Sequence, residues 1–95
     1  MMLKVLKING QSLSPEYRDG DYVVITRFWR KPVLGDVIVF RNETYGIMIK
    51  KTISSADDDF FVIGSHPNSV DSRQFGAVNR KDMIGKVIWH IRRSD

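Results

Sequence analysis

The first residues that could do chemistry lie in a polar segment that follows an apolar stretch near the amino terminus. This segment reads Asn9-Gly10-Gln11-Ser12-Leu13-Ser14-Pro15. Glycine permits a tight backbone approach and proline fixes the chain soon afterwards, so Ser12 could present its hydroxyl and its own backbone N–H to a bound carbonyl. Ser12 is therefore a candidate nucleophile. The alternative is a polar loop in which Ser14 caps a short helical turn that begins at Pro15.

A candidate general base for such a serine lies in a later apolar run, Gly46-Ile47-Met48-Ile49-Lys50-Lys51. Burial disfavours a charged ammonium group and lowers its pKa from about 10.4 toward neutrality, so a desolvated lysine can accept a proton. Side chains alternate between the two faces of a strand, so Lys50 and Lys51 point in opposite directions and one of them faces inward. The alternative is a strand with a solvent face, from which the lysine extends into water.

Histidine is the more usual base, but neither histidine of this chain stands beside an obvious partner. His90 follows Trp89 near the end of an apolar run and is interpreted as a surface or edge residue. The chain has no cysteine and two histidines, which excludes a disulfide framework, a thiolate zinc site and a cysteine nucleophile. We expect neither a metal ion nor a cofactor.

A third polar segment ends in Ser69-Val70-Asp71-Ser72-Arg73-Gln74-Phe75-Gly76. Asp71 and Arg73 can pair, and the hydroxyls of Ser69 and Ser72 can satisfy neighbouring donors, including a neutral lysine amine. The segment is predicted to be a loop that bonds to itself. It either supports a functional site or is a rigid turn without one.

The elements that position these residues are predicted to be short strands. Apolar, β-branched runs separated by turn-forming residues favour strands over helices. The predicted strands cover residues 3–8, 22–26, 36–40, 45–53, 60–63 and 84–91, with a charged hairpin tip at residues 57–59. Asn79 is predicted to cap a second short helical turn. This spacing predicts a mostly β fold, a small, strongly bent and partly open β-barrel-like sheet with one or two helical turns.

Length, charge and hydropathy limit the class of protein further. A chain of 95 residues closes a single hydrophobic core, so residues 1–95 are predicted to form one domain. The net charge of +4 is spread over dispersed basic residues, which favours a solvated surface over a specific nucleic-acid site. No apolar run approaches the roughly 18 residues of a membrane span, so we expect no transmembrane anchor and a soluble, cytoplasmic protein. The cluster Phe28-Trp29-Arg30 either contacts a partner or a membrane surface, or packs within its own loop.

Taken in order, these segments resemble the peptidase fold shared by type I signal peptidases and the self-cleaving LexA-type repressors (S24/S26 serine peptidases). The first matching box runs from Gly10 to Pro15 and leads to Gly20-Asp21 before an apolar strand. The second box is Pro32-Val33-Leu34-Gly35-Asp36-Val37-Ile38-Val39-Phe40, and the third is the strand that ends in Lys50-Lys51. The fourth is the segment from Ser69 to Gly76, followed by Ile84-Gly85-Lys86-Val87. The chain looks closest to compact soluble members such as nickel superoxide dismutase maturation peptidases.

The resemblance implies a serine endopeptidase that uses a Ser/Lys dyad. Ser12 would be the nucleophile and Lys50 the general base, with Gly10 in support and the Ser12 backbone N–H in an oxyanion hole. Its partner would be a protein or peptide substrate, cleaved after a small residue. No specific nucleic-acid partner is expected, and the oligomeric state is left open.

The resemblance also implies supporting roles for the last polar segment. Ser69 would hold the Lys50 amine, and the ion pair of Asp71 with Arg73 would keep the loop in place. The sequence departs from the family pattern at Gly64-Ser65-His66, where Gly-Asp-Asn is usual. The alternative function is therefore a catalytically inactive β module of the same fold that mediates protein binding or dimerisation.

Overall fold

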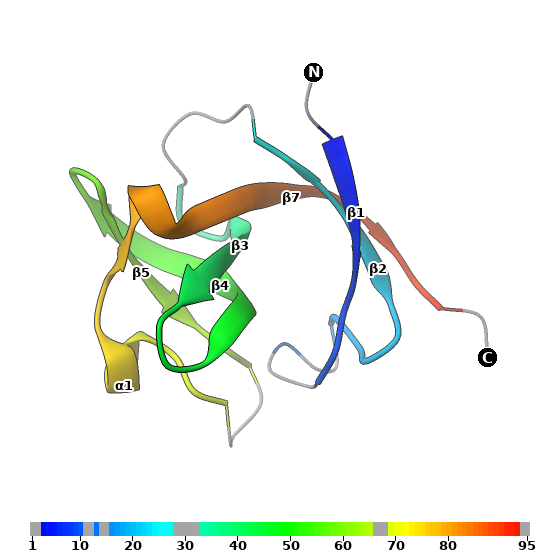
Figure 1. The fold of residues 1–95 in the computed structure, drawn as a ribbon, viewed down its shortest axis with the longest axis horizontal. Helices are drawn as coiled ribbons and strands as arrows, with labels where there is room; N and C mark the ends of the chain where they lie inside the picture. Colours follow the sequence, from blue (N-terminus) through cyan, green and yellow to red (C-terminus); the bar gives the residue numbers. More distant parts are fainter. Residues whose placement is uncertain (1–2, 11–12, 14–15, 28–32, 66–68, 94–95) are drawn as a thin grey trace.

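The computed structural model describes residues 3–10, 13, 16–27, 33–65 and 69–93. They form one seven-stranded sheet in the order β1-β2-β7-β3-β4-β5-β6, in which every pairing is antiparallel (Figure 1). The strands are β1 (Leu3–Lys7), β2 (Tyr22–Thr26), β3 (Val37–Asn42), β4 (Gly46–Ala56), β5 (Asp59–Ile63), β6 (Val78–Asn79) and β7 (Met83–Ile91). The predicted mostly β fold, with a small open sheet, is confirmed.

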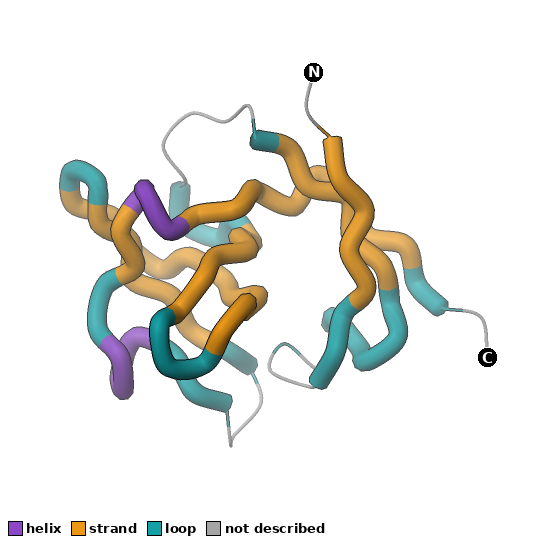
Figure 2. Tube along the Cα trace, in the orientation of Figure 1, coloured by secondary structure: helices purple, strands orange, loops and turns teal. Residues whose placement is uncertain are grey.

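The helical elements are short, as Figure 2 makes plain. Helix α1 (Ser72–Phe75) lies in the segment predicted to be a loop, and the 3-10 turn η1 (Arg80–Asp82) follows β6. The side chain of Asn79 accepts a hydrogen bond from the backbone N–H of Lys81 at 3.0 Å, so the predicted cap is confirmed. The predicted cap at Ser14 lies outside the described residues. No helix in the described ranges is long and apolar enough to cross a membrane.

Strand β7 joins the two halves of the sheet, because it pairs with β2 along its carboxyl-terminal part and with β3 along its amino-terminal part (Figure 1). Gly85 lies where these pairings meet. A Cβ atom at this position would lie 2.9 Å from Ile25 Cδ1 and 3.0 Å from the Thr26 carbonyl oxygen. The absence of a side chain at Gly85 therefore lets β7 pack closely against β2.

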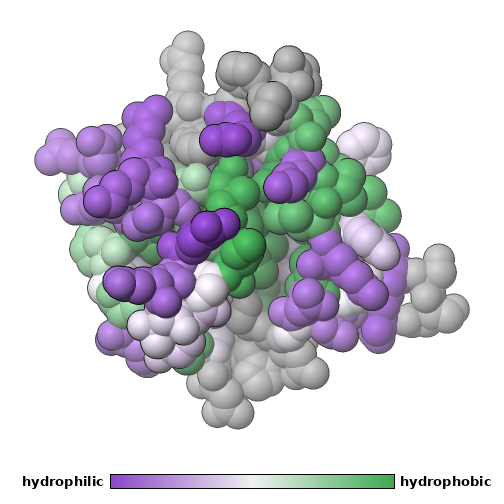
Figure 3. Space-filling model, viewed as in Figure 1, coloured by the Kyte–Doolittle hydropathy of each residue, from purple (hydrophilic) through white to green (hydrophobic). Residues whose placement is uncertain are grey.

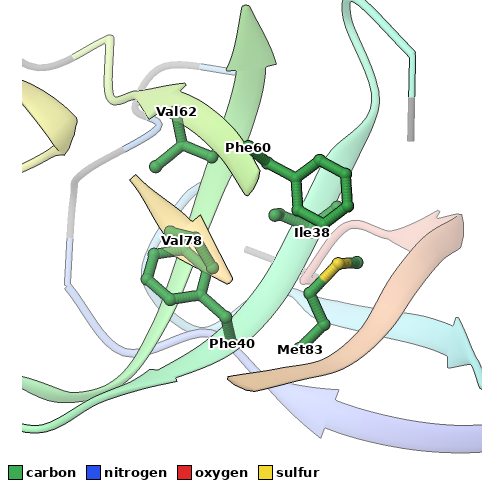
Figure 4. Packing of buried hydrophobic residues seen from close by; sticks show 6 residues of the cluster. All are labelled: Ile38, Phe40, Phe60, Val62, Val78 and Met83. Atoms are coloured by element: carbon green, nitrogen blue, oxygen red, sulfur yellow. The ribbon is translucent and has the colours of Figure 1, made fainter. Parts of the chain in front are cut away.

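Strand β3 is buried on both faces, and a separate apolar cluster lies against each face. One cluster, drawn in Figure 4, comprises Ile38, Phe40, Phe60, Val62, Val78 and Met83. The other comprises Ile8, Val23, Ile25 and Val39. Because side chains alternate along a strand, Val39 points away from its neighbours Ile38 and Phe40 and into the second cluster. Burial of this apolar surface is the main force that holds the sheet in its bent form.

The turn before β3 is tied to β4 by hydrogen bonds. The backbone N–H of Gly35 donates to the Thr52 carbonyl at 2.8 Å, and the N–H of Thr52 donates to the Asp36 carbonyl at 2.7 Å. The Asp36 carboxylate accepts the N–H of Val33 at 2.9 Å and so closes the turn on itself. Gly35 has φ +92°, a conformation that glycine adopts without strain. These contacts fix the register of β4 two residues beyond Lys50.

Candidate functional site

Lys50 faces the interior and Lys51 faces outward, as the alternation of a strand predicts. Lys50 lies in β4 opposite Ile38 of β3, and 1% of it is exposed. Burial lowers the pKa of Lys50 below its usual value, and the charge of Asp71 opposes this effect. Lys51 instead forms an ion pair with Glu16, with Nζ to Oε2 at 2.9 Å. Lys50 therefore loses its proton more easily than an exposed lysine does.

Lys50 lies on the wall of a hollow of about 520 Å³, and Gly10 and Val70 line the same hollow. Its remaining walls are largely apolar and include Leu6 of β1 and Ile47 of β4. On the face seen in Figure 3, apolar surface runs down the middle between hydrophilic groups on either side. A hollow of this size and lining suits a segment of extended peptide. The predicted nucleophile, Ser12, lies outside the described residues.

The segment that contains Ser12 is anchored at its base, where the two ends of the loop meet. Ile8 donates its N–H to the Asp21 carbonyl at 2.7 Å, and Gly20 donates its N–H to the Ile8 carbonyl at 2.8 Å. Gly10, at φ +96°, donates its N–H to Asp19 Oδ1 at 2.8 Å. Leu13 is also buried. The chain is therefore held on both sides of Ser12.

Asp21 is the buried centre of this anchor, and sequence reasoning did not give it a role. Its carboxylate accepts the backbone N–H of Arg93 at 2.9 Å and that of Arg18 at 3.0 Å, and it lies 2.7 Å from His90 Nε2. These bonds, with that of Arg93 the strongest, hold the pKa of Asp21 well below its usual range. The signal in the sequence was the Gly20-Asp21 pair itself, because an aspartate after a turn glycine often accepts backbone donors.

His90 is not the surface or edge residue that the sequence suggested. Its side chain is 16% exposed, and its ring stacks on that of Tyr17 with centroids 4.3 Å apart. Both of its partners, Asp21 and Tyr17, are remote in the sequence, so no local pattern could reveal the contact. His90 therefore helps to join the end of β7 to the loop that contains Ser12.

Asp71 and Arg73 form the ion pair that the sequence predicted. Asp71 is fully buried, and its two carboxylate oxygens accept the Arg73 guanidinium at 3.0 Å and 2.9 Å. They also accept the backbone N–H groups of Arg73 at 3.0 Å and Gly64 at 3.1 Å. The side-chain bond from Arg73 is the main reason that the pKa of Asp71 falls to about 2. Asp71 also caps helix α1, in a reciprocal arrangement with Gln74.

Ser69 does not make the bond to Lys50 that was expected of it. Its hydroxyl oxygen is buried and has no hydrogen-bond partner among the described residues. Its neighbour Val70 lines the hollow that contains Lys50. Ser72, by contrast, accepts the backbone N–H of Val62 at 2.8 Å, which ties α1 to β5. The buried hydroxyl of Ser69 thus retains an unused donor and acceptor next to a residue that lines the hollow.

Within the described ranges, no three His, Cys, Asp or Glu side chains are grouped so that they could hold a metal ion. The cluster Phe28-Trp29-Arg30 and the histidine His66 lie outside the described residues.

The sequence was also compared with known protein families. The family model described as Peptidase S24-like matches residues 2–88, so the chain belongs to the S24-like peptidase family. No match was found among curated proteins.

Proposed function

We propose that the protein is a serine endopeptidase, in which Ser12 is the nucleophile and Lys50 is the general base within one catalytic domain. One observation carries the proposal: a buried lysine lines the same hollow as Gly10, which precedes Ser12 by two residues. Chain connectivity keeps the Cα atoms of Gly10 and Ser12 within about 7 Å of each other. Membership of a peptidase family supports the same assignment.

In the proposed reaction, neutral Lys50 accepts the proton of the Ser12 hydroxyl as its oxygen attacks the scissile carbonyl carbon. The backbone N–H of Ser12 donates to the oxyanion that forms. When this intermediate collapses, the carbon–nitrogen bond breaks and the leaving amine takes the proton from Lys50. Lys50 then deprotonates a water molecule that hydrolyses the ester, and Ser12 regains its proton. Burial suits Lys50 to this cycle because it favours the neutral amine.

The substrate that fits this site is an extended peptide. Strand β1 is the first strand in the sheet order, and its residue Leu6 lines the hollow together with the adjoining Ile8. A peptide can therefore add to the edge of β1 and present alternate side chains to the hollow. We propose that the residue before the scissile bond is small, because it must pass close to the nucleophile.

The test is digestion of a mixed peptide library, with the products identified by mass spectrometry. The wild-type protein should cleave peptides after Ala or Gly and leave those with Phe or Lys at that position largely intact. Ser12→Ala should abolish cleavage and leave the circular dichroism spectrum unchanged. Wild-type activity in Ser12→Ala would contradict the nucleophile, and equal cleavage after Ala and Phe would contradict the small residue.

A second candidate function, a non-catalytic binding or dimerisation module, is favoured by a row of apolar side chains across three strands. Val5, Val24 and Trp89 are direct neighbours in β1, β2 and β7, and Val5 and Trp89 are 59% and 69% exposed. Under this alternative, the wild-type protein would cleave no peptide. Analytical ultracentrifugation would then detect self-association that Trp89→Ser weakens.

A further inference from the structure

A second hollow, of about 250 Å³, is lined by three cationic side chains: Lys4, Arg27 and Arg41. They come from different places in the sequence. Lys4 lies in β1, Arg27 follows β2 and Arg41 lies in β3. The fold therefore gathers three positive charges around one small hollow, which no local basic run in the sequence would produce.

Among the residues that the structure describes, no acidic side chain lines this hollow. In the described part of the chain, the ion pairs join Lys51 to Glu16, Arg73 to Asp71, Lys86 to Asp36 and His90 to Asp21, and none of them involves the three cations of the hollow. Three like charges without a carboxylate repel one another and create a positive potential at the hollow. Such a site favours an anionic group, and arginine offers a carboxylate two parallel N–H donors.

The cationic hollow adjoins the larger hollow that contains Lys50. Leu6 and Ile47 line both of them. Ile47 lies opposite Arg41 in the pairing of β3 with β4, and it precedes Lys50 by three residues in β4. Three residues of strand span about 10 Å. A peptide that passes Lys50 in an extended conformation therefore reaches the cationic hollow within about three to five of its own residues.

We propose that the cationic hollow is a specificity subsite, which binds an acidic side chain of the peptide substrate on one side of the scissile bond. The inference rests on the proposed peptidase function, since it assigns a substrate class to the same cleft. Lys4, Arg27 and Arg41 are specificity-determining residues in this account, and they take no part in the bond-breaking step. The substrate class is a protein with an extended, cleavable segment that carries an acidic residue near the cleavage site.

The test compares cleavage of peptides in which Asp or Asn is placed in turn at each position around a cleavable Ala bond. Asp at one position, about three to five residues from that bond, should raise kcat/KM about tenfold over Asn, and added salt should reduce the difference. Arg41→Glu should remove this preference and favour Lys at the same position, while circular dichroism reports that the variant is folded. If Arg41→Glu impairs folding, Arg41→Gln and Lys4→Gln take its place, and each of them should lower the preference for Asp. Arg80→Gln, on the exposed turn η1, removes an equal charge elsewhere and should leave the preference intact.

Binding to Ser12→Ala, measured by fluorescence anisotropy with the same labelled peptides, separates this inference from the proposed function. Tighter binding of the Asp peptide to Ser12→Ala without any cleavage by the wild-type protein would uphold the subsite and contradict the peptidase. Cleavage with no preference for Asp at any position would overturn the subsite and leave the peptidase standing. An equal preference in Arg41→Glu and Arg80→Gln would also overturn it. So would a DNA oligonucleotide that binds through Arg41 while Asp and Asn peptides bind alike, because the hollow would then belong to a nucleic acid.

Discussion

Lys50 and Asp71 are both buried, with 1% and 0% of each residue exposed, yet the pKa of the lysine is lowered. Loss of water around the amine outweighs the attraction of the Asp71 carboxylate. The Arg73 guanidinium already binds both oxygens of that carboxylate. The ion pair of Asp71 with Arg73 therefore helps to keep Lys50 from gaining a close counter-ion, which is the condition that a neutral lysine base requires.

The dependence of activity on pH follows from this relationship. Lys50 acts as a base when neutral, so kcat/KM should fall as the pH falls through its depressed pKa. At higher pH, kcat/KM should reach a plateau below pH 10.5, the usual value for lysine. The measurement is a pH profile of kcat/KM with a cleavable peptide. His66→Ala should leave the acid limb in place, whereas loss of that limb in His66→Ala would assign the base to histidine.

Lys50→Met should raise the stability of the domain at neutral pH. Because burial lowers the pKa of Lys50 in the folded state, the charged amine is less favourable there than in the unfolded chain, and this penalty is complete below the folded pKa and is lost as the pH rises to about 10.5. Methionine keeps the volume without that penalty, so Tm should rise by about 4–8 °C for each kcal/mol regained. The difference between variant and wild type should shrink as the pH approaches 10.5. A lower Tm for Lys50→Met at pH 7 would contradict a pKa of Lys50 that is lowered by burial.

Arg73→Ala should lower the free energy of unfolding at neutral pH by about 1–3 kcal/mol, because it leaves the buried Asp71 carboxylate with fewer hydrogen bonds. The Arg73 side chain itself is 66% exposed, so the loss comes from the carboxylate and not from packing. Thermal denaturation of Arg73→Ala beside Arg80→Ala gives the measurement, because Arg80 is exposed and forms no ion pair with a carboxylate among the described residues. Equal Tm values for the two variants would contradict the supporting role.

The same carboxylate should govern part of the acid stability. The pKa of Asp71 is about 2 in the folded protein and about 3.9 in an unfolded chain. Its contribution is therefore complete above about pH 4 and is lost as the pH falls through about 2. Unfolding curves between pH 2 and pH 5 should show a smaller loss of stability in Arg73→Ala than in the wild type. Parallel curves would mean that Arg73 does not set this pKa.

Asp21→Ala and Asp19→Ala should have different effects on the segment that contains Ser12: the first should lower the stability of the fold, and the second should lower activity. Asp21→Ala leaves two backbone N–H groups and the His90 ring without their hydrogen-bond partner, so it should lower the free energy of unfolding by more than about 2 kcal/mol. Asp19 is exposed and holds the N–H of Gly10, so Asp19→Ala should cost less than about 1 kcal/mol but lower kcat several-fold. Chemical denaturation and steady-state kinetics give the two quantities. Equal losses of stability would contradict the buried role of Asp21.

Much of the fold could be predicted from the sequence because its strands are amphipathic or apolar runs between turn formers. The limits of β2 agree with those predicted, and Lys50 faces inward as strand alternation requires. Strand β6, with two residues, is too short to leave a periodic pattern. Helix α1 was missed because it has only four residues, three of them polar, and its capping aspartate suggested a turn.

The contacts at the site were harder to predict than the strands. The pair of Asp71 with Arg73 is local and could be inferred from spacing alone. The contact of His90 with Asp21 and the three cations of the smaller hollow depend on which strands become neighbours, and hydropathy patterns do not contain that information. Ser69 shows the reverse case: its neighbour Val70 lines the hollow, but the Ser69 hydroxyl does not make the expected hydrogen bond.

The most direct test of the dyad compares two adjacent lysine substitutions on opposite faces of β4, Lys50→Met and Lys51→Met, in one cleavage assay. Lys51 is paired with Glu16 on the outside of the strand, so its loss should change kcat/KM by less than about threefold. Lys50→Met should lower kcat/KM by at least about a hundredfold while the protein stays folded. Activity that survives in Lys50→Met, or that falls equally in the two variants, would contradict Lys50 as the general base.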